Sequence, residues 1–87
     1  MKLSHDELTE RLDIAKQQIE IGSKYRHYKS PEMTYEVKDI VIQEADSEPC
    51  VIYQALYGNQ ITFSRTVSVW LESVEVEDKL VPRFTKL

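Results

Sequence analysis

The residues best able to do chemistry are gathered in one short stretch, Tyr25-Arg26-His27-Tyr28-Lys29, which combines two phenols, an imidazole and two cations. Two further arginines, Arg65 and Arg83, occur later in the chain. Guanidinium groups present a planar set of N–H donors to carboxylates and phosphates, and tyrosine rings present faces on which a planar group can stack. These residue types are typical of a site that binds an anionic ligand, a peptide or a nucleic acid.

Side-chain alternation limits how these residues can be combined. On a strand, Arg26 and Tyr28 would point to one face, whereas His27 and its neighbours at residues 25 and 29 would point to the other. The five residues of the stretch therefore cannot form one patch, and we expect Arg26 and Tyr28 to be joined by Arg65 or Arg83. The predicted ligand-binding residues are Arg26, His27, Tyr28, Arg65 and Arg83.

A purely structural role is the alternative for the same residues. Tyr28 would then pack in the core, and the arginines would pair with Glu36, Glu72 or Glu75. The two interpretations differ in whether the guanidinium groups are accessible to a ligand.

Catalysis is the least favoured of the functional classes. The ordinary pKa of a histidine suits His27 to proton transfer near neutral pH, but no serine or cysteine stands beside it in the setting of a nucleophile. The sequence also lacks a glycine-rich phosphate loop. We therefore expect a protein that acts by binding and is not an enzyme.

The acidic stretch with Glu44, Asp46 and Glu48 raises the question of a metal site. Its spacing matches no calcium loop, and no glycine stands at the turning point. The two histidines and the single cysteine occur at spacings that do not match a zinc site. We expect neither a metal nor a cofactor.

Composition limits the class of partner. The chain has 87 residues, of which 41% are hydrophobic and 30% charged, so it is expected to form one globular domain. Its formal net charge of −4 opposes non-specific binding to duplex DNA. The expected partner is an unknown protein or a small anionic ligand, with single-stranded nucleic acid as the alternative.

Cysteine usage and hydropathy indicate the compartment. Cys50 is the only cysteine and cannot form an internal disulfide; at the start of an apolar segment it is expected to be a buried, inert thiol. No secretory leader follows Met1, and no apolar run approaches the ~20 residues that cross a bilayer. We expect a soluble cytoplasmic protein with no membrane contact.

The elements that must position the site begin with a helix over about residues 4–21. Ser4 and Glu7 have the spacing of a capping box, and Gly22 suits the left-handed position that ends a helix. One apolar stripe follows the helical period: Leu8, Leu12, Ala15 and Ile19. We expect this stripe to dock on the protein's own sheet; docking on a second copy, in a homodimer, is the alternative.

Short strands are predicted for the rest of the chain. In chain order, we expect a strand over 24–29, a turn at 30–32, a strand over 35–44, a loop at 45–49, a strand over 50–57, a turn at 58–59, strands over 60–65 and 74–77, and a tail over 80–87.

Four local features refine this prediction. A change of phase near Lys38-Asp39 predicts a β-bulge. Residues 50–57 are apolar on both faces, which predicts a central strand covered on both sides. A short helical turn after Thr66 would point Trp70 inward, and Phe84 would pin the tail to the core.

The expected fold is mainly β with one N-terminal helix, in the α+β class. It divides into an amphipathic helix over 1–22 and a β-rich domain over 23–87. We predict a small, strongly curled antiparallel sheet of the SH3-like barrel kind; the alternative is a flatter antiparallel sheet packed by one helix.

Four spaced strings also resemble a known family: YRHYK at 25–29, YEV at 35–37, VIYQALYG at 51–58 and VPRF at 81–84. Together they are similar to the bacterial and phage family called Domain of Unknown Function 1653, over about residues 22–87. The resemblance implies a compact, largely β domain and brings no established activity.

Overall fold

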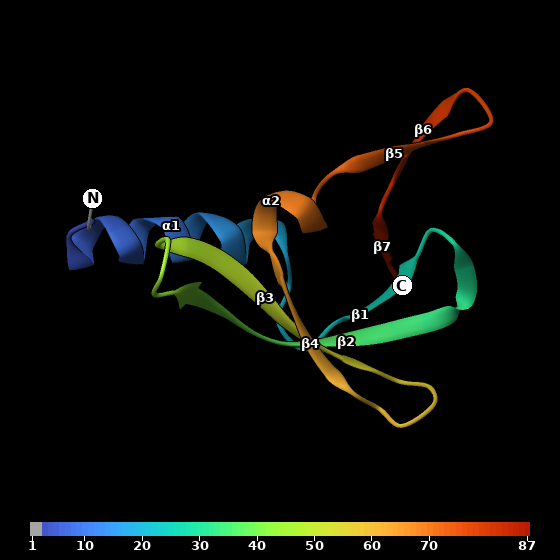
Figure 1. The fold of residues 1–87 in the computed structure, drawn as a ribbon, viewed down its shortest axis with the longest axis horizontal. Helices are drawn as coiled ribbons and strands as arrows, with labels where there is room; N and C mark the ends of the chain where they lie inside the picture. Colours follow the sequence, from blue (N-terminus) through green and yellow to red (C-terminus); the bar gives the residue numbers. More distant parts are fainter. Residues whose placement is uncertain (1–2) are drawn as a thin grey trace.

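The first element of the computed structural model, which describes residues 3–87, is helix α1, His5–Gln18 (Figure 1). The Ser4 hydroxyl accepts from the backbone N–H of Glu7 at 3.2 Å, and the Glu7 carboxylate accepts from the N–H of Ser4 at 3.2 Å. The predicted capping box is confirmed. The helix ends before the predicted residue 21, because Ile19 is already extended, and Gly22 takes a positive φ of 89° in the turn that follows.

Five strands form one antiparallel sheet in the order β4-β3-β2-β1-β7. The strands are β1 Lys24–His27, β2 Ser30–Gln43, β3 Glu48–Ala55, β4 Thr62–Thr66 and β7 Phe84–Lys86. Between β4 and β7 the chain makes helix α2, Val67–Trp70, and a separate hairpin of β5, Ser73–Val76, and β6, Lys79–Pro82. Figure 1 shows this hairpin standing away from the five-stranded sheet.

The β1–β2 hairpin differs from the prediction. Its turn is Tyr28-Lys29, and His27 pairs directly with Ser30, so the turn expected at 30–32 lies inside β2. The pairing then moves from His27↔Ser30 to Arg26↔Thr34, which leaves residues 31–33 as extra residues on β2. Pro31 has no N–H to donate to a ladder, which explains the irregularity here.

The predicted bulge in the middle of β2 is confirmed. Val37 pairs with Tyr53 and Asp39 pairs with Ile52, so Lys38 is an extra residue between them. Because of this insertion both Val37 and Ile40 point to the buried face. The apparent loss of alternation in the sequence is thus a feature of one continuous strand.

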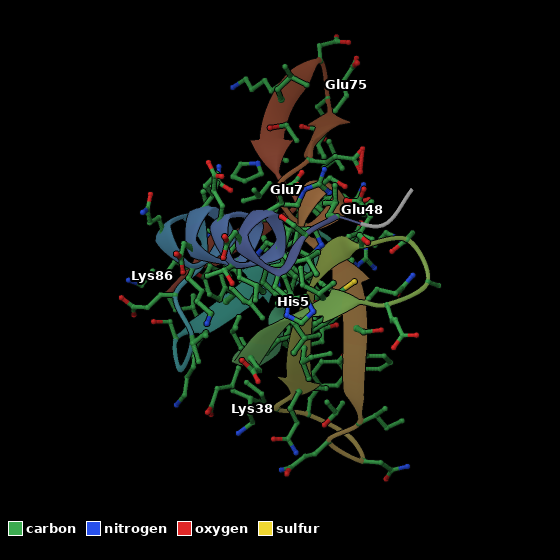
Figure 2. All side chains as sticks on the ribbon, turned by 90° about the vertical axis from the view of Figure 1, so that its left-hand side faces the viewer. His5, Glu7, Lys38, Glu48, Glu75 and Lys86 are labelled. Atoms are coloured by element: carbon green, nitrogen blue, oxygen red, sulfur yellow. The ribbon has the colours of Figure 1, made fainter. Side chains whose placement is uncertain are left out.

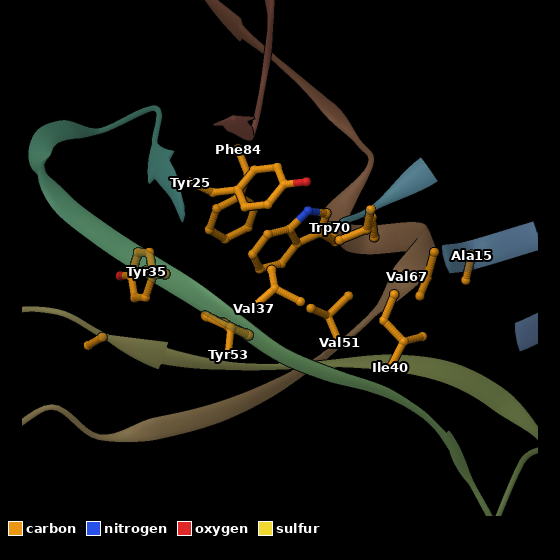
Figure 3. Close-up of a cluster of buried hydrophobic side chains, with 12 residues drawn as sticks. Ala15, Tyr25, Tyr35, Val37, Ile40, Val51, Tyr53, Val67, Trp70 and Phe84 are labelled. Atoms are coloured by element: carbon orange, nitrogen blue, oxygen red, sulfur yellow. The ribbon is translucent and has the colours of Figure 1, made fainter. Parts of the chain in front are cut away.

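One face of the sheet carries the hydrophobic core (Figure 3). Helix α1 contributes Ala15, and Ile19 directly after its end also packs there, which confirms that the apolar stripe docks on the protein's own sheet. Helix α2 contributes Val67 and Trp70, and the Trp70 side chain is only 3% exposed, as the predicted inward helical turn requires. The strands supply the remaining buried residues: Tyr25, Tyr35, Val37, Ile40, Val51, Tyr53, Ala55 and Phe84.

The sheet is open, so the predicted SH3-like barrel is not formed within residues 3–87. The edge strands β4 and β7 do not pair with each other, and the chain between them builds α2 and the β5–β6 hairpin instead of further sheet. Since α1 and α2 already cover the part of the apolar face that holds the core, burial of the core does not require closure. The flatter sheet packed by one long helix is the alternative that fits.

Strand β3 is central but is not covered equally on both sides, as had been expected. Val51, Tyr53 and Ala55 face the core and are buried, whereas Ile52 and Gln54 on the other face are only half-buried. The interior of a curled sheet would have covered that second face, and it does not exist in the open arrangement. Cys50 is buried as predicted, and burial raises the pKa of its thiol.

Phe84 pins the C-terminal segment to the core. Its ring stacks on Trp70 with centroids 3.7 Å apart and planes only 6° from parallel. Edge contacts join the same ring to Tyr53 at 5.8 Å and Tyr35 at 5.9 Å. Figure 3 shows Phe84 against Trp70 and Tyr25 above the strands. The predicted role of Phe84 is confirmed.

Truncation of this ring should strongly destabilise the protein. We expect Phe84→Ala to lower the free energy of unfolding by about 3 kcal/mol or more, because a cavity replaces a buried ring. Urea denaturation followed by Trp70 fluorescence measures the change. Leu80→Ala is the control: Leu80 is 76% exposed, so its truncation should alter the free energy by no more than about 0.5 kcal/mol. Equal effects of the two variants would contradict the role given to Phe84.

Candidate functional site

A cavity of about 390 Å³ lies between the β1–β2 hairpin and the β5–β6 hairpin. The residues that line it are Arg26, His27, Tyr28, Pro31, Val76, Val81, Pro82 and Thr85. We call it the hairpin cavity. It brings together three residues of the predicted site, and its second wall comes from a part of the chain about fifty residues away in sequence.

Arg26 is the free cation of this cavity. Its side chain is exposed, and it makes no ion pair within residues 3–87. Other surface cations do have carboxylate partners: Lys38 lies 3.1 Å from Glu36, and Lys86 lies 3.2 Å from Glu20. Figure 2 shows Lys38, Lys86 and Glu75 at well-separated positions on the surface. The guanidinium of Arg26 therefore remains accessible to an external anion.

Tyr28 is held at the cavity by its backbone. It occupies the β1–β2 turn, and its N–H donates to the carbonyl of Arg83 at 3.0 Å, which ties the turn to the start of β7. Its side chain is half-buried and is not part of the core cluster. The structural alternative, in which Tyr28 packs in the core, does not describe this residue.

His27 lies where the cavity meets the aromatic core. Its ring is 5.1 Å from that of Phe84 and 4.7 Å from that of Tyr28. The backbone N–H of Lys29 donates to Nδ1 at 3.3 Å, which assigns the proton of the neutral imidazole to Nε2. Burial lowers the pKa of His27, and the positive charges of Arg65, Lys29 and Arg83 lower it further.

Arg65 lies outside the hairpin cavity. It projects from β4 to the core side of the sheet, opposite Val51, and its Nε donates to the hydroxyl of Tyr53 at 3.4 Å. Its guanidinium carbon is 5.8 Å from the centre of the Phe84 ring, within the range of a cation–π contact. It is half-buried and makes no ion pair within the described part of the chain.

Arg83 also lies outside the cavity lining, and its contacts are structural. Its guanidinium is 3.8 Å from the Glu72 carboxylate, and its backbone N–H donates to the Glu72 carbonyl at 3.0 Å. These two contacts close the base of the β5–β6 hairpin. An arginine paired with Glu72 is what the structural alternative predicts. The sequence predicts that Arg65 or Arg83 joins Arg26 and Tyr28 in one site. Neither arginine lines the hairpin cavity: Arg65 lies on the core side of the sheet, and Arg83 lies at the base of the β5–β6 hairpin.

Sequence reasoning missed the second wall of the cavity. Val76 and Val81 belong to the β5–β6 hairpin, whose turn, Glu77-Asp78, has two residues with positive φ of 50° and 66°. Two consecutive left-handed residues between strands form the tight turn that hairpins favour. The sequence predicts a turn at Asp78-Lys79, one residue later than observed, but treats residues 80–87 as a tail, so the returning strand β6 was missed.

Other kinds of site were sought in the same residues. Among residues 3–87, no three His, Cys, Asp or Glu side chains are placed to hold a metal ion. Over that range, no helix has the length and apolar character needed to span a membrane.

Comparison with known proteins identifies the family. The family model described as "Protein of unknown function (DUF1653)" matches residues 23–86. The chain belongs to this family. The match includes every residue of the hairpin cavity and excludes helix α1.

A solved DUF1653 structure has a similar fold. It is a crystal structure of a protein from Bordetella bronchiseptica, with a TM-score of 0.70 and 27% sequence identity, covering 82% of this chain and 90% of that one. No curated protein matches the chain. The resemblance found in the four sequence strings is confirmed.

The lowered pKa of His27 makes stability depend on pH. The unfolded chain, with a histidine pKa near 6.5, binds more protons than the folded chain just below that pH, so the free energy of unfolding should fall as the pH drops through this window. Urea denaturation between about pH 5.5 and 7.5 measures the slope. We expect His27→Gln to flatten it.

His5→Gln is the matched control, because it removes the other imidazole, on α1 instead of β1, and should leave the slope in place. A His27→Gln protein with the unchanged wild-type slope would show that His27 is not the group responsible.

Proposed function

We propose that this DUF1653 protein is a non-catalytic binding module whose hairpin cavity takes a small anionic ligand or an acidic group of a peptide. The observation that carries the proposal is the exposed guanidinium of Arg26, unpaired within residues 3–87, at the edge of a preformed cavity. A volume of about 390 Å³ falls in the range of small-molecule sites. One cation beside apolar walls suits a ligand with one anionic group and an apolar body.

The lining residues divide the work of recognition. Arg26 can donate two parallel N–H groups to a carboxylate or phosphate, which orients the ligand as well as attracting it. The Tyr28 ring and the apolar side chains of Val76 and Val81 would contact the rest of the ligand. This lining therefore supports a role in ligand binding.

Net charge supports a small ligand over a polyanion. The chain carries −4 overall, so a nucleic acid is repelled at long range and must rely on local contacts. Single-stranded nucleic acid is the alternative occupant. The salt dependence of binding distinguishes these two ligands. Phosphate-backbone binding weakens steeply between about 50 and 200 mM salt, whereas binding of a single anionic group in an apolar cavity changes little.

The direct test is a ligand screen by two-dimensional NMR, with a library of organic carboxylates, phosphate monoesters and short acidic peptides. We expect hits to shift the amide signals of Arg26, Tyr28 and Val81. Arg26→Ala should weaken these hits by about tenfold or more, because a charge-assisted bidentate contact is lost.

Lys24→Ala is the matched control. Lys24 lies on the same strand and the same face as Arg26, carries the same charge and does not line the cavity. It should bind the hits as the wild type does. Equal weakening in both variants would mean that net charge alone causes the effect, which would contradict the proposal. The proposal would also fail if no compound shifted the amide signals of the cavity residues.

A further inference from the structure

A second surface, separate from the hairpin cavity, is built from neighbouring aromatic rings on the core side of the sheet. Tyr35 contacts Tyr53 at 5.2 Å and Tyr57 at 5.6 Å, and Tyr53 contacts Phe63 at 5.7 Å, measured between ring centroids. We call these four residues the aromatic face. They come from β2, from β3 and the turn that follows it, and from β4.

Two rings of the aromatic face are open to solvent. Phe63 is 41% exposed and Tyr57 is 37% exposed, although Tyr35 and Tyr53 beneath them are buried. The Tyr57 hydroxyl lies 2.6 Å from that of Tyr35, which fixes the Tyr57 ring. Burial and this hydrogen bond raise the pKa of Tyr35 far above its usual value, so its phenol stays neutral. The surface is a rigid platform on which a planar group could stack.

The cation beside this platform is Arg65, which has no carboxylate partner among the described residues. Arg65 contacts the hydroxyl of Tyr53 and the ring of Phe84, and makes no ion pair within residues 3–87. Within residues 3–87 the Arg65 guanidinium is thus left without a carboxylate partner, although the chain as a whole carries a net charge of −4.

The exposed ring of Phe63 and the guanidinium of Arg65 together indicate the class of ligand. Phe63 and Arg65 are alternate residues of β4, so they share one face and their Cα atoms are about 7 Å apart. A nucleoside monophosphate carries a planar base for the ring and a phosphate for the guanidinium in one small molecule. Base stacking on an exposed ring tolerates any base, and the guanidinium fork fits phosphate oxygens.

We infer that the aromatic face binds a free nucleoside monophosphate, with the base on Phe63 and the phosphate at Arg65. A free nucleotide is favoured over a nucleic-acid strand because the net negative charge of the protein opposes a long polyanion far more than a single phosphate. Neither Arg65 nor any residue of the aromatic face lines the hairpin cavity, so this inference does not rest on the proposed function.

Isothermal titration calorimetry with five probes tests the ligand class: AMP, UMP, adenosine, ribose 5-phosphate and a single-stranded RNA hexamer. AMP and UMP should bind, and adenosine and ribose 5-phosphate should each bind at least about tenfold more weakly, because each lacks one of the two contacts. Binding of adenosine as tight as that of AMP would remove Arg65 from the site. A hexamer that binds more tightly than AMP would overturn the assignment to a free nucleotide.

Variants on β4 test the residues. Phe63→Leu keeps an apolar side chain at an exposed position and should weaken AMP at least about fivefold through the loss of the ring. Arg65→Gln should weaken AMP but leave adenosine unchanged, and Arg65→Lys should bind AMP more tightly than Arg65→Gln does. Near-ultraviolet circular dichroism of Trp70 checks that each variant is folded.

Lys38→Ala is the matched control, because it removes an exposed cation that lies outside both the aromatic face and the hairpin cavity, and it should bind AMP as the wild type does. Loss of AMP binding in Arg26→Ala, with binding retained in Phe63→Leu and Arg65→Gln, would place AMP in the hairpin cavity and overturn the inference. Unchanged AMP binding in both Phe63→Leu and Arg65→Gln, or no binding by the wild type at millimolar AMP, would overturn the inference itself.

Discussion

The stack of Phe84 on Trp70 is the contact on which the arrangement of this protein depends. The two rings are nearly parallel at 3.7 Å, and edge contacts extend from them to Tyr25, Tyr35 and Tyr53 on the three central strands β1, β2 and β3. Aromatic pairs add directional stabilisation to the burial of their area. Because Trp70 ends α2 and Phe84 begins β7, the stack joins both ends of the chain segment that carries the β5–β6 hairpin.

Both candidate sites follow from this junction. Once Phe84 is buried, β7 pairs with β1, and the carbonyl of Arg83 is placed to accept from the N–H of Tyr28. The β5–β6 hairpin is then held beside the β1–β2 turn without joining the sheet, which leaves the hairpin cavity between them. On the core side, helices α1 and α2 leave Phe63 and Tyr57 uncovered, which leaves the aromatic face exposed.

Local signals in the sequence predicted the local features well. The Ser4–Glu7 capping box, the extra residue Lys38 and the inward turn at Trp70 each depend on a few neighbouring residues, and each is found in the structure. The barrel was not found, because alternation within a strand does not say which strands lie at an edge. Phe63 shows the same limit: it alternates with polar neighbours as a buried residue would, yet β4 is an edge strand and the Phe63 side chain is 41% exposed.

The site was predicted in part for a similar reason. Arg26, His27 and Tyr28 are adjacent in sequence, so their residue types identified them. Val76 and Val81 complete the cavity only through long-range packing, and Arg65 and Arg83 were assigned to one patch although the strands direct them elsewhere. Residue types identified the candidate cations, but only the tertiary structure shows which of them pair with a carboxylate among the described residues.

The central claim is that the stack of Phe84 on Trp70 holds the hairpin cavity in a preformed state. Native-state amide hydrogen exchange of Tyr28 measures this most directly, because its N–H bonds to the carbonyl of Arg83, next to Phe84. The account predicts slow exchange, protected to a similar degree as the amide of Tyr53 in the central strand. Exchange at the rate of an unstructured peptide would mean that the β1–β2 turn is not held against β7, and would contradict it.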